Sequence, residues 1–419
     1  MPPAPLHRSL ATELSVEVAL REIGRLGFPV HLEEVGLASH PVRISRLVRD
    51  GVEVAVGYGK GVGLQGVASA YFEALEHYFT SARSNRRFAG GAAALLSASE
   101  VADQTGLRED LVIQRWAEEF PASVAACAVY HGSRGSVWYP VFLSDPRYHL
   151  QPLAGDSVES YRSLLRYTST LGTASGVNVP EAVLHGLCEL VEHDGLSHAL
   201  LRWFIARMAQ VDLVDPESLP PRLKLLYLDA VTAVGAPVFL LDVTTDVAVP
   251  VYVAVKDDEA ELGLFGAGAS PSGEYAAERA LSELIQMSAL AEPEAARAAI
   301  NHLSAWPALQ ECIRLPIRRL LSEAIRYVPL RGNIGELGTV ESSLSTVARL
   351  LHDCGIEFYT CELAPPESQI AVATTIAPGL ERFSLVHLGM PVIPTGRGWS
   401  LWTAARTRRR QAQPSHVDT

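Results

Sequence analysis

Three segments of the chain repeat one arrangement that limits what it can fold into. In each, two polar, oxygen-bearing side chains stand three residues apart among apolar residues of helical character. The segments are residues 70–77 (AYFEALEH), 185–193 (HGLCELVEH) and 279–286 (RALSELIQ). Residues at positions i and i+3 lie on the same face of a helix. Each pair is therefore predicted to project from one side of a partly buried helix.

Most of the paired residues are glutamates, and burying an unpaired carboxylate is costly. A single pair of this kind most often lies on a solvated helix face, but three pairs in apolar surroundings favour a site that binds cations. Glutamate oxygens are hard ligands that suit magnesium, which usually shares phosphate oxygens with a nucleotide. We therefore predict a magnesium–nucleotide site. The carboxylates of these pairs that would require cations are Glu73, Glu76, Glu189, Glu192 and Glu283.

A stretch that contains glycine precedes each of these helices. The stretches are residues 57–66, 172–176 and 263–273. Backbone N–H groups at a helix N-terminus can bind phosphate, and glycine lets the backbone approach closely. These stretches are accordingly predicted to let backbone N–H groups approach a phosphate at the N-terminus of each helix.

Two common nucleotide motifs fit the first glycine stretch less well. Gly61, Gly63 and Gly66 have the spacing of a dinucleotide fingerprint, but no second strand ending in an acidic residue follows about twenty residues later. A Walker A loop needs serine or threonine after its glycine–lysine pair, whereas Lys60 is followed by Gly61. The zinc motif HExxH is absent, and the helices lack the ExxH pairs of di-iron bundles.

Predicted strands and helices alternate along the 419 residues without long linkers, and 48% of the residues are hydrophobic. The fold class is therefore predicted to be α/β of a mixed α+β kind, in one large domain. Residues 14–36 are predicted to contain a helix and then a short strand around Phe28–Leu32. Further helices are predicted at 64–80, 98–119, 180–207, 274–290 and 341–353. Strands are predicted at 51–58, 124–130, 137–143, 238–243, 249–255, 356–361 and 370–376.

Composition narrows the partners and the compartment. The formal net charge of −12 argues against a nucleic-acid partner. The basic run at Arg406 and Arg408–Arg410 is interpreted as part of a solvated tail. The chain shows neither an apolar stretch of transmembrane length nor a signal-peptide pattern at its start. Five cysteines without a CxxC pair are typical of reduced thiols, so a cytoplasmic protein that has no membrane partner is expected.

Taken in order, the motifs resemble those of the YcaO family. The run Gly59-Lys60-Gly61, followed by Ser69, Glu73, Glu76 and His77, is similar to the family's GKG and SxxxExxER motif. The run Gly172–Gly176, followed by Glu181, Glu189, Glu192 and His193, is similar to the second motif. Glu278, Glu283 and Gln286 are similar to the third, and Pro378–Glu381 with Pro394 and Arg397 match a common YcaO ending. The resemblance runs from about residue 20 to 405.

The resemblance implies a dedicated α/β domain that holds ATP and Mg²⁺ between the glutamate-bearing helices. It divides the chain into an N-terminal helix and strand part (1–50), an ATP-binding catalytic domain (51–405) and a basic, polar tail (406–419). The residues that the resemblance assigns to ATP and magnesium are Lys60, Ser69, Glu73, Glu76, His77, Ser175, Asn178, Glu181, Glu189, Glu192, His193, Glu283, Gln286 and Arg397. It assigns no catalytic residue.

The activity that the resemblance implies is ATP-dependent phosphorylation of backbone amides in a ribosomally made precursor peptide. Cyclodehydration of Cys, Ser or Thr to azolines is the leading expectation. Thioamide or amidine formation and a non-catalytic scaffold that binds a precursor or a partner stay open. Because residues 1–50 leave little room for a leader-binding domain, a ThiF-like or TfuA-like partner is expected to deliver the peptide. A homodimer is also compatible with the family.

The chain departs from the family pattern at several positions. Histidine replaces the arginine that closes the first two motifs, at His77 and His193. The usual serine and asparagine of the second motif fall on Ala174 and Val177, with Ser175 and Asn178 one residue later. The proline-rich tail of many azoline-forming members is missing, which raises the weight of thioamide and amidine chemistry.

Overall fold

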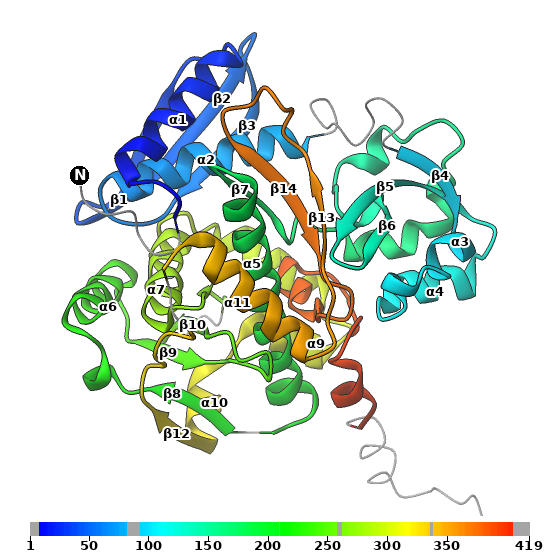
Figure 1. The fold of residues 1–419 in the computed structure, drawn as a ribbon. Helices are drawn as coiled ribbons and strands as arrows, with labels where there is room; N and C mark the ends of the chain where they lie inside the picture. Colours follow the sequence, from blue (N-terminus) through cyan, green and yellow to red (C-terminus); the bar gives the residue numbers. More distant parts are fainter. Residues whose placement is uncertain (1–7, 82–92, 209, 258–261, 336–337, 405–419) are drawn as a thin grey trace, which may run out of the picture.

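The computed structural model describes residues 8–81, 93–208, 210–257, 262–335 and 338–404 (Figure 1). The predicted tail, 406–419, lies outside the described residues. The strands are β1 (His31–Leu37), β2 (His40–Arg49), β3 (Val52–Gly59), β4 (Ala93–Ser97), β5 (Val124–Gly132), β6 (Gly135–Pro140), β7 (Thr173–Gly176), β8 (Gln210–Val214), β9 (Val238–Asp242), β10 (Val251–Lys256), β11 (Phe265–Ala269), β12 (Ala324–Val328), β13 (Tyr359–Glu362) and β14 (Ala371–Ile376). The α-helices are α1 (Thr12–Arg25), α2 (Leu64–Thr80), α3 (Ala98–Ala102), α4 (Leu111–Glu119), α5 (Val179–Leu200), α6 (Pro221–Val234), α7 (Gly273–Ala289), α8 (Pro293–His302), α9 (Pro307–Arg314), α10 (Ile317–Glu323) and α11 (Val340–Asp353).

The described strands form three sheets. Their orders are β1-β2-β3, β11-β10-β9-β8-β12 and β4-β5-β13-β14-β7, with β6 paired to β5. Strands β8 and β12 pair in parallel, and the other recorded pairs are antiparallel. The mixed α+β class predicted from the sequence is confirmed. Because β3 belongs to an antiparallel sheet, the glycines after it do not open the parallel βαβ unit that a dinucleotide fingerprint requires.

Helix α5 runs through the middle of the molecule (Figure 1). It contacts β7 and β14 of one sheet, β10 and β11 of another, and helix α11. A helix surrounded in this way has to be apolar on nearly all sides. Leu184, Leu187, Val191 and Leu200 are accordingly buried, which makes the polar residues on the same helix exceptional.

Three edge strands of the sheets contain glycine. They are β3, β7 and β11, and each is followed directly by one of the helices α2, α5 and α7. Glycines in these strands bring the helix backbone into direct contact. A Cβ atom built on Gly57 would lie 2.2 Å from the backbone nitrogen of Ala74, and one on Gly266 would lie 2.2 Å from that of Leu284. These positions exclude any side chain, so the strand and the helix form one rigid unit.

The second and third glycine stretches, to which the sequence analysis assigned no secondary structure, contain strands. Residues 173–176 form β7 and residues 265–269 form β11, because their glycines serve close strand–helix packing rather than chain flexibility. The first stretch does contain a turn between β3 and α2. There, Gly61 and Gly63 have φ angles of 112° and 58°, in the region that favours glycine.

The N-terminal prediction needs a shift along the chain. The helix ends at Arg25, and Gly27 follows with a φ of 76°, as is common just after a helix. The strand predicted around Phe28–Leu32 begins later, at His31, and β2 was not predicted. Both strands pair into the sheet of β3, so the N-terminal part is continuous with the predicted catalytic domain. Among the described helices, none combines the length and hydropathy that a membrane crossing needs.

Replacing Gly266 by alanine should lower the free energy of unfolding by about 3 kcal/mol or more, because the methyl group would overlap the backbone of α7. The matched control is Gly24→Ala in α1, where a Cβ would meet nothing within 4 Å. That change should raise stability by up to about 1 kcal/mol through helix propensity. Chemical denaturation of both variants measures the difference, and an equal effect would contradict the packing argument.

Candidate functional site

A cavity of about 340 Å³ lies between helices α2, α5 and α7 and strand β7. Most of the predicted site residues line it, although they come from three separate parts of the sequence. These residues are Lys60, Ser69, Glu73, Glu76, His77, Ser175, Glu189, Glu192, His193, Glu283 and Gln286. The structure therefore brings the three polar pairs together around one space, which we call the acidic cavity.

Main-chain groups at the ends of the sheets position the carboxylates. Three glutamates accept hydrogen bonds from N–H groups in or beside the end strands. The pairs are Glu73 with Tyr58, Glu189 with Gly172 at 3.0 Å, and Glu192 with Ala269. Gln286 in turn donates from Nε2 to the carbonyl oxygen of Tyr58 at 2.7 Å. Main-chain groups of these edge strands that do not pair with a neighbouring strand thus orient the side chains that line the cavity.

The side chain of Ser175 links strand β7 to helix α2. Its hydroxyl lies 3.1 Å from the carbonyl oxygen of Phe72 and 3.1 Å from Oε2 of Glu76. Because Ser175 belongs to β7 and the other two residues belong to α2, this contact fixes the distance between the second strand–helix unit and the first. It also shows how serine at this position, one residue later than in the family pattern, reaches the cavity.

Five carboxylates line the acidic cavity together with the cationic side chains of Arg8, Lys60 and Arg279. Lys60 forms an ion pair with Glu283. Burial alone would raise the pKa of Glu283, but Lys60 and Arg279 outweigh it and hold that pKa below its usual value. One of the five carboxylates is thus well compensated by the protein itself.

Three other carboxylates are poorly compensated. Burial, with the charge of Glu192 as a second cause, raises the pKa of Glu189 to about 8. Burial and the charge of Glu283 raise the pKa of Glu192 to about 7. Burial and the charge of Glu189 raise the pKa of Glu76 well above its usual value. A cation entering the cavity would lower these raised pKa values, so the carboxylates favour the binding of positive charge.

The two histidines that replace the family's arginines both line the cavity. His77 donates from Nδ1 to the carbonyl oxygen of Val56 at 2.5 Å, and Nδ1 of His193 lies 2.9 Å from the hydroxyl of Ser384. Burial lowers the pKa of His193 to about 4, so this ring is neutral at pH 7. His193 therefore does not supply the positive charge of an arginine.

The donor set of the cavity fits magnesium that is shared with a phosphate. Magnesium in proteins commonly takes one or two carboxylates and completes its octahedron with water and phosphate oxygens. Within the described ranges, no three acidic, histidine or cysteine side chains are close enough together to hold a metal ion by themselves. Carboxylates such as Glu189 and Glu192, buried with raised pKa values, are the groups that would bind such an ion.

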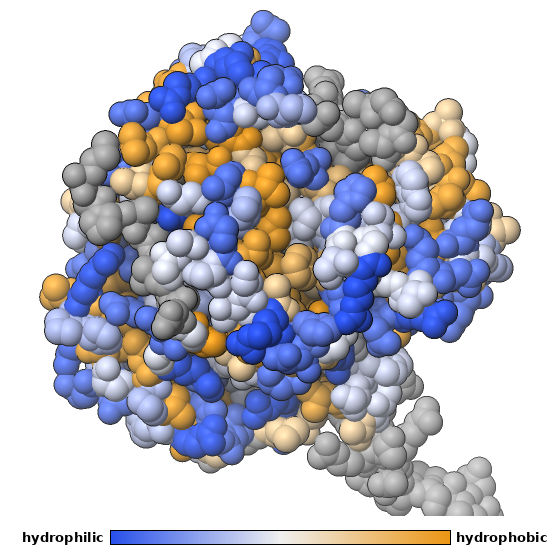
Figure 2. Space-filling view, in the orientation of Figure 1, coloured by the Kyte–Doolittle hydropathy of each residue, from blue (hydrophilic) through white to orange (hydrophobic). Residues whose placement is uncertain are grey.

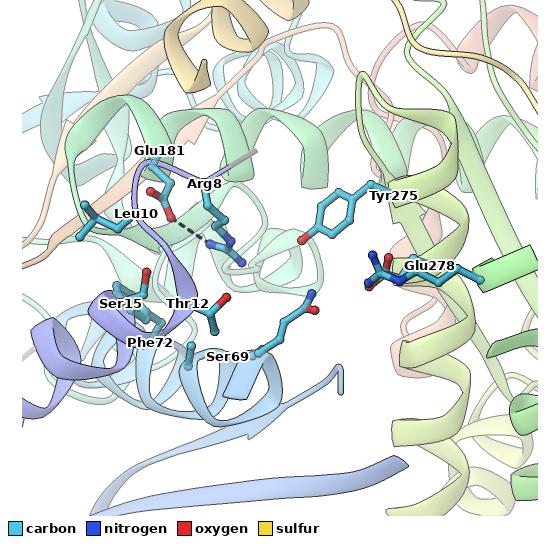
Figure 3. Close-up of a pocket in the computed structure, with 12 residues that line it drawn as sticks. Arg8, Leu10, Thr12, Ser15, Ser69, Phe72, Glu181, Tyr275 and Glu278 are labelled. Carbon is cyan, nitrogen blue, oxygen red and sulfur yellow. Dashed lines mark hydrogen bonds and ion pairs between the residues drawn. The ribbon is translucent and has the colours of Figure 1, made fainter. Parts of the chain in front are cut away.

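A smaller cavity of about 120 Å³ adjoins the acidic cavity and shares Arg8, Ser69 and Phe72 with it. Figure 3 shows Arg8 between Glu181 on one side and Tyr275 on the other, with Ser69 and Phe72 below. Arg8 donates to Oε1 of Glu181 at 3.0 Å. The start of the described chain thereby forms one wall of both cavities.

Three predicted site residues lie outside the acidic cavity. Asn178 caps helix α5 by accepting from the N–H of Glu181 at 3.0 Å, and Glu181 holds Arg8 in the smaller cavity. Arg397 lies near the other end of α5, where its Nε is 3.2 Å from Oδ1 of Asp194. Their assignment to the nucleotide stays a prediction.

Sequence reasoning missed two cations of the site. Arg279 stands four residues before Glu283 on α7, a spacing that places both on one helix face, so this signal was present in the third motif. Arg8 had no comparable signal, because only the path of the chain brings it to Glu181, 173 residues away.

Comparison with known families agrees with this geometry. Residues 58–381 match the model of a family described as YcaO cyclodehydratase, ATP- and Mg²⁺-binding. The chain belongs to the YcaO family. The match contains all three polar pairs, so the ATP- and Mg²⁺-binding character of the domain agrees with the cavity's chemistry.

Two solved structures have the same fold. YcaO from Methanopyrus kandleri, bound with AMPPCP and Mg²⁺, has a TM-score of 0.65 and 20% identity, over 92% of this chain and 96% of that chain. A heterocyclase in complex with substrate and cofactor has a TM-score of 0.65 and 18% identity, over 94% of this chain and 58% of that chain. At these identities the likeness establishes the fold.

Two sequence relatives are more similar over part of their length. A protein of Rhizobium leguminosarum bv. trifolii, described as lying in the tfuA 3′ region, is 30% identical over 247 residues, which are 55% of this chain and 57% of the relative. A Methanothermobacter thermautotrophicus protein is 29% identical over 237 residues, which are 54% and 59% of the two chains. The matches thus span less than two thirds of these relatives.

The raised carboxyl pKa values predict that the protein without ligand loses stability as the pH rises from about 6.5 to 8. Glu189 and Glu192 retain protons in the folded state that an unfolded chain has already released, so the folded state binds more protons. The lowered pKa of His193 has the opposite effect, but only below about pH 6.5. Thermal melting of the wild-type protein and of Glu189→Gln should show a smaller decline for the variant. An equally steep decline would contradict this assignment.

Proposed function

We propose that this chain uses ATP and Mg²⁺ to activate backbone amides in a peptide substrate. The observation that carries the proposal is the convergence of Glu76, Glu189 and Glu192, three buried carboxylates with raised pKa values, on a single cavity. Such a cluster is unfavourable in the protein alone. It becomes favourable when Mg²⁺ and the phosphates it carries enter together.

Different parts of the nucleotide would occupy the two cavities. The acidic cavity would hold the Mg²⁺-bound phosphates, with Lys60 close enough to exchange Glu283 for a phosphate oxygen. The smaller cavity, which continues from it past Ser69 and Phe72, would take the base and ribose. Its mixture of apolar and polar side chains suits a nucleoside, which has an apolar ring face and hydrogen-bonding edges.

The chain's own residues would contribute position and charge. Bound ATP would supply a phosphoryl group that turns the oxygen of the attacked amide into a good leaving group. Lys60 and Arg279 would stabilise negative charge beside the carboxylates, as cationic side chains do in phosphoryl transfer. The neutral ring of His193 would act as a hydrogen-bonding group rather than as a counter-ion.

Among the products compatible with a YcaO site, thioamides gain support from the relative in the tfuA 3′ region. That relative favours a TfuA-like partner over a ThiF-like partner, and sulfur transfer over the azoline chemistry that the sequence placed first. The proposal is therefore an ATP-dependent thioamide-forming activity, with azoline formation as the competing product.

A scaffold that binds a precursor without turnover is the second candidate. The specific observation in its favour is that Lys60 is already paired with Glu283 while His193 is neutral. The cavity thus offers a phosphate fewer free cations than two additional arginines would supply.

Calorimetric titration of ATP with Mg²⁺ separates the two candidates. The intact protein should bind ATP saturably, and the variant that combines Glu189→Gln with Glu192→Gln should bind at least about a hundredfold more weakly, because the ligands of the ion are lost. Glu118→Gln, on an exposed position of α4, is the matched control and should bind like the wild type. Absence of binding by the intact protein would favour the scaffold.

The product can be read by mass spectrometry of the peptides encoded beside the gene. With ATP, Mg²⁺, a sulfide source and a TfuA-like partner, the proposed activity exchanges one oxygen for sulfur. Azoline formation would instead remove one water per ring. A water loss without sulfur exchange would contradict the thioamide proposal and retain amide activation.

A further inference from the structure

A groove of about 330 Å³ lies beside the acidic cavity and is distinct from the smaller cavity. It is lined by Glu53, Val54, Ala55, Val56, His77, Thr80, Ser81, Asp145, Pro146, Arg147 and Thr170. Two of these residues, His77 and Thr170, also line the acidic cavity. The groove and the acidic cavity therefore adjoin each other at these two side chains.

One wall of the groove is the edge of strand β3. The side chains of a strand point alternately to its two faces, so four consecutive residues can line one groove only along the strand's edge. Residues 53–56 meet this condition. In the described part of the chain β3 pairs with β2 alone, so this edge has no strand beside it.

The hydrogen bonds of the cavity identify which main-chain groups face this edge. Tyr58 donates to Glu73 and accepts from Gln286, and the carbonyl oxygen of Val56 accepts from His77. In an antiparallel ladder, residues two apart present their N–H and C=O groups to the same side. The N–H of Val56 therefore also faces the groove rather than β2.

A bulge limits the length of this open edge. The register between β2 and β3 shifts between Leu47 and Val48, and it leaves Val54 without a partner on β2. A bulge bends a strand and interrupts further pairing. The edge can thus pair with a short extended segment only, which argues against a long strand from a second copy of the chain.

The opposite wall is a turn with an exposed positive charge. The N–H of Arg147 donates to Oδ1 of Asp145 at 2.9 Å, which shapes the turn around Pro146. The side chain of Arg147 is exposed, and no ion pair is recorded for it within the described residues. It can therefore attract an acidic group on whatever lies in the groove.

We propose that a short extended segment of the peptide substrate binds in this groove and accepts a hydrogen bond from the N–H of Val56. The segment would add to the edge of β3, a mode of recognition that reads the main chain of a peptide. The following amide would then pass His77 into the acidic cavity. The inference rests on the proposed function, because the groove gains this meaning only if the adjoining cavity acts on peptides.

The test is a selection of randomised linear peptides by display on the full chain, followed by fluorescence polarisation with the enriched peptides. Val56→Pro removes the outward N–H without removing a hydrogen bond of the β2–β3 ladder. It should weaken peptide binding by about tenfold, the upper range for one hydrogen bond. Val56→Ala keeps the N–H and should bind within about twofold of the wild type.

Two further variants keep the test decisive. Leu32→Pro makes the same change on β1, the other end of this sheet, and should leave peptide binding unchanged. Arg147→Glu lies on an exposed turn and should change the preference of the enriched peptides from acidic to basic residues. Equal binding by Val56→Pro and the wild type, or no enrichment of any peptide, would overturn the proposal.

Calorimetry with ATP separates this result from the fate of the proposed function. Val56→Pro should bind ATP with wild-type affinity, since none of the acidic residues is changed, and this also shows that the variant is folded. If the wild type binds ATP but Val56→Pro binds the peptides as tightly as the wild type does, the groove proposal is wrong and the proposed function is unaffected. If peptides depend on Val56 but the wild type does not bind ATP, the proposed activity fails and the peptide groove remains.

Discussion

The contact between glycines in three end strands and the helices that follow them is the constraint on which the site depends. At Gly57 and Gly266 there is no space for even one methyl group, so α2 and α7 rest directly on a strand backbone. Gly176 contributes a similar approach, with a built Cβ 2.8 Å from the backbone nitrogen of Ala182 in α5. Because each helix has a fixed height above its strand, the carboxylates three residues apart on each helix reach the same cavity.

The electrostatics of the cavity follow from this enforced proximity. Like charges that the backbone holds together cannot separate, so burial and mutual repulsion raise the pKa values of Glu189 and Glu192. The main chain compensates only part of the cost, through N–H groups at the ends of the sheets. The negative charge that stays uncompensated favours the binding of a divalent cation. The close packing at the glycines thereby contributes to the binding of a nucleotide.

Some of this could be predicted from local pattern. The i, i+3 spacing of Glu73 and Glu76 and of Glu189 and Glu192 fixed which side chains share a helix face, and α2 and α5 are the helices that this spacing predicts. Strands β7 and β11 were not predicted, although glycines mark both of them. A glycine that permits a turn and a glycine that permits close packing look alike in a sequence, and the difference lies in the φ angle and in the neighbour.

The sequence by itself determined the three helices α2, α5 and α7, the polar pairs they carry, their order and hence the family, because these features depend on residues only a few positions apart. Only the tertiary structure decided which groups meet. The ion pair of Lys60 with Glu283 and the approach of Arg8 to Glu181 join residues distant in the chain. The edge of β3 at Val56 is open because, among the described residues, β3 pairs with β2 alone. Such contacts arise from the packing of α2, α5 and α7 around one cavity, which the spacing of residues within a single helix does not reveal.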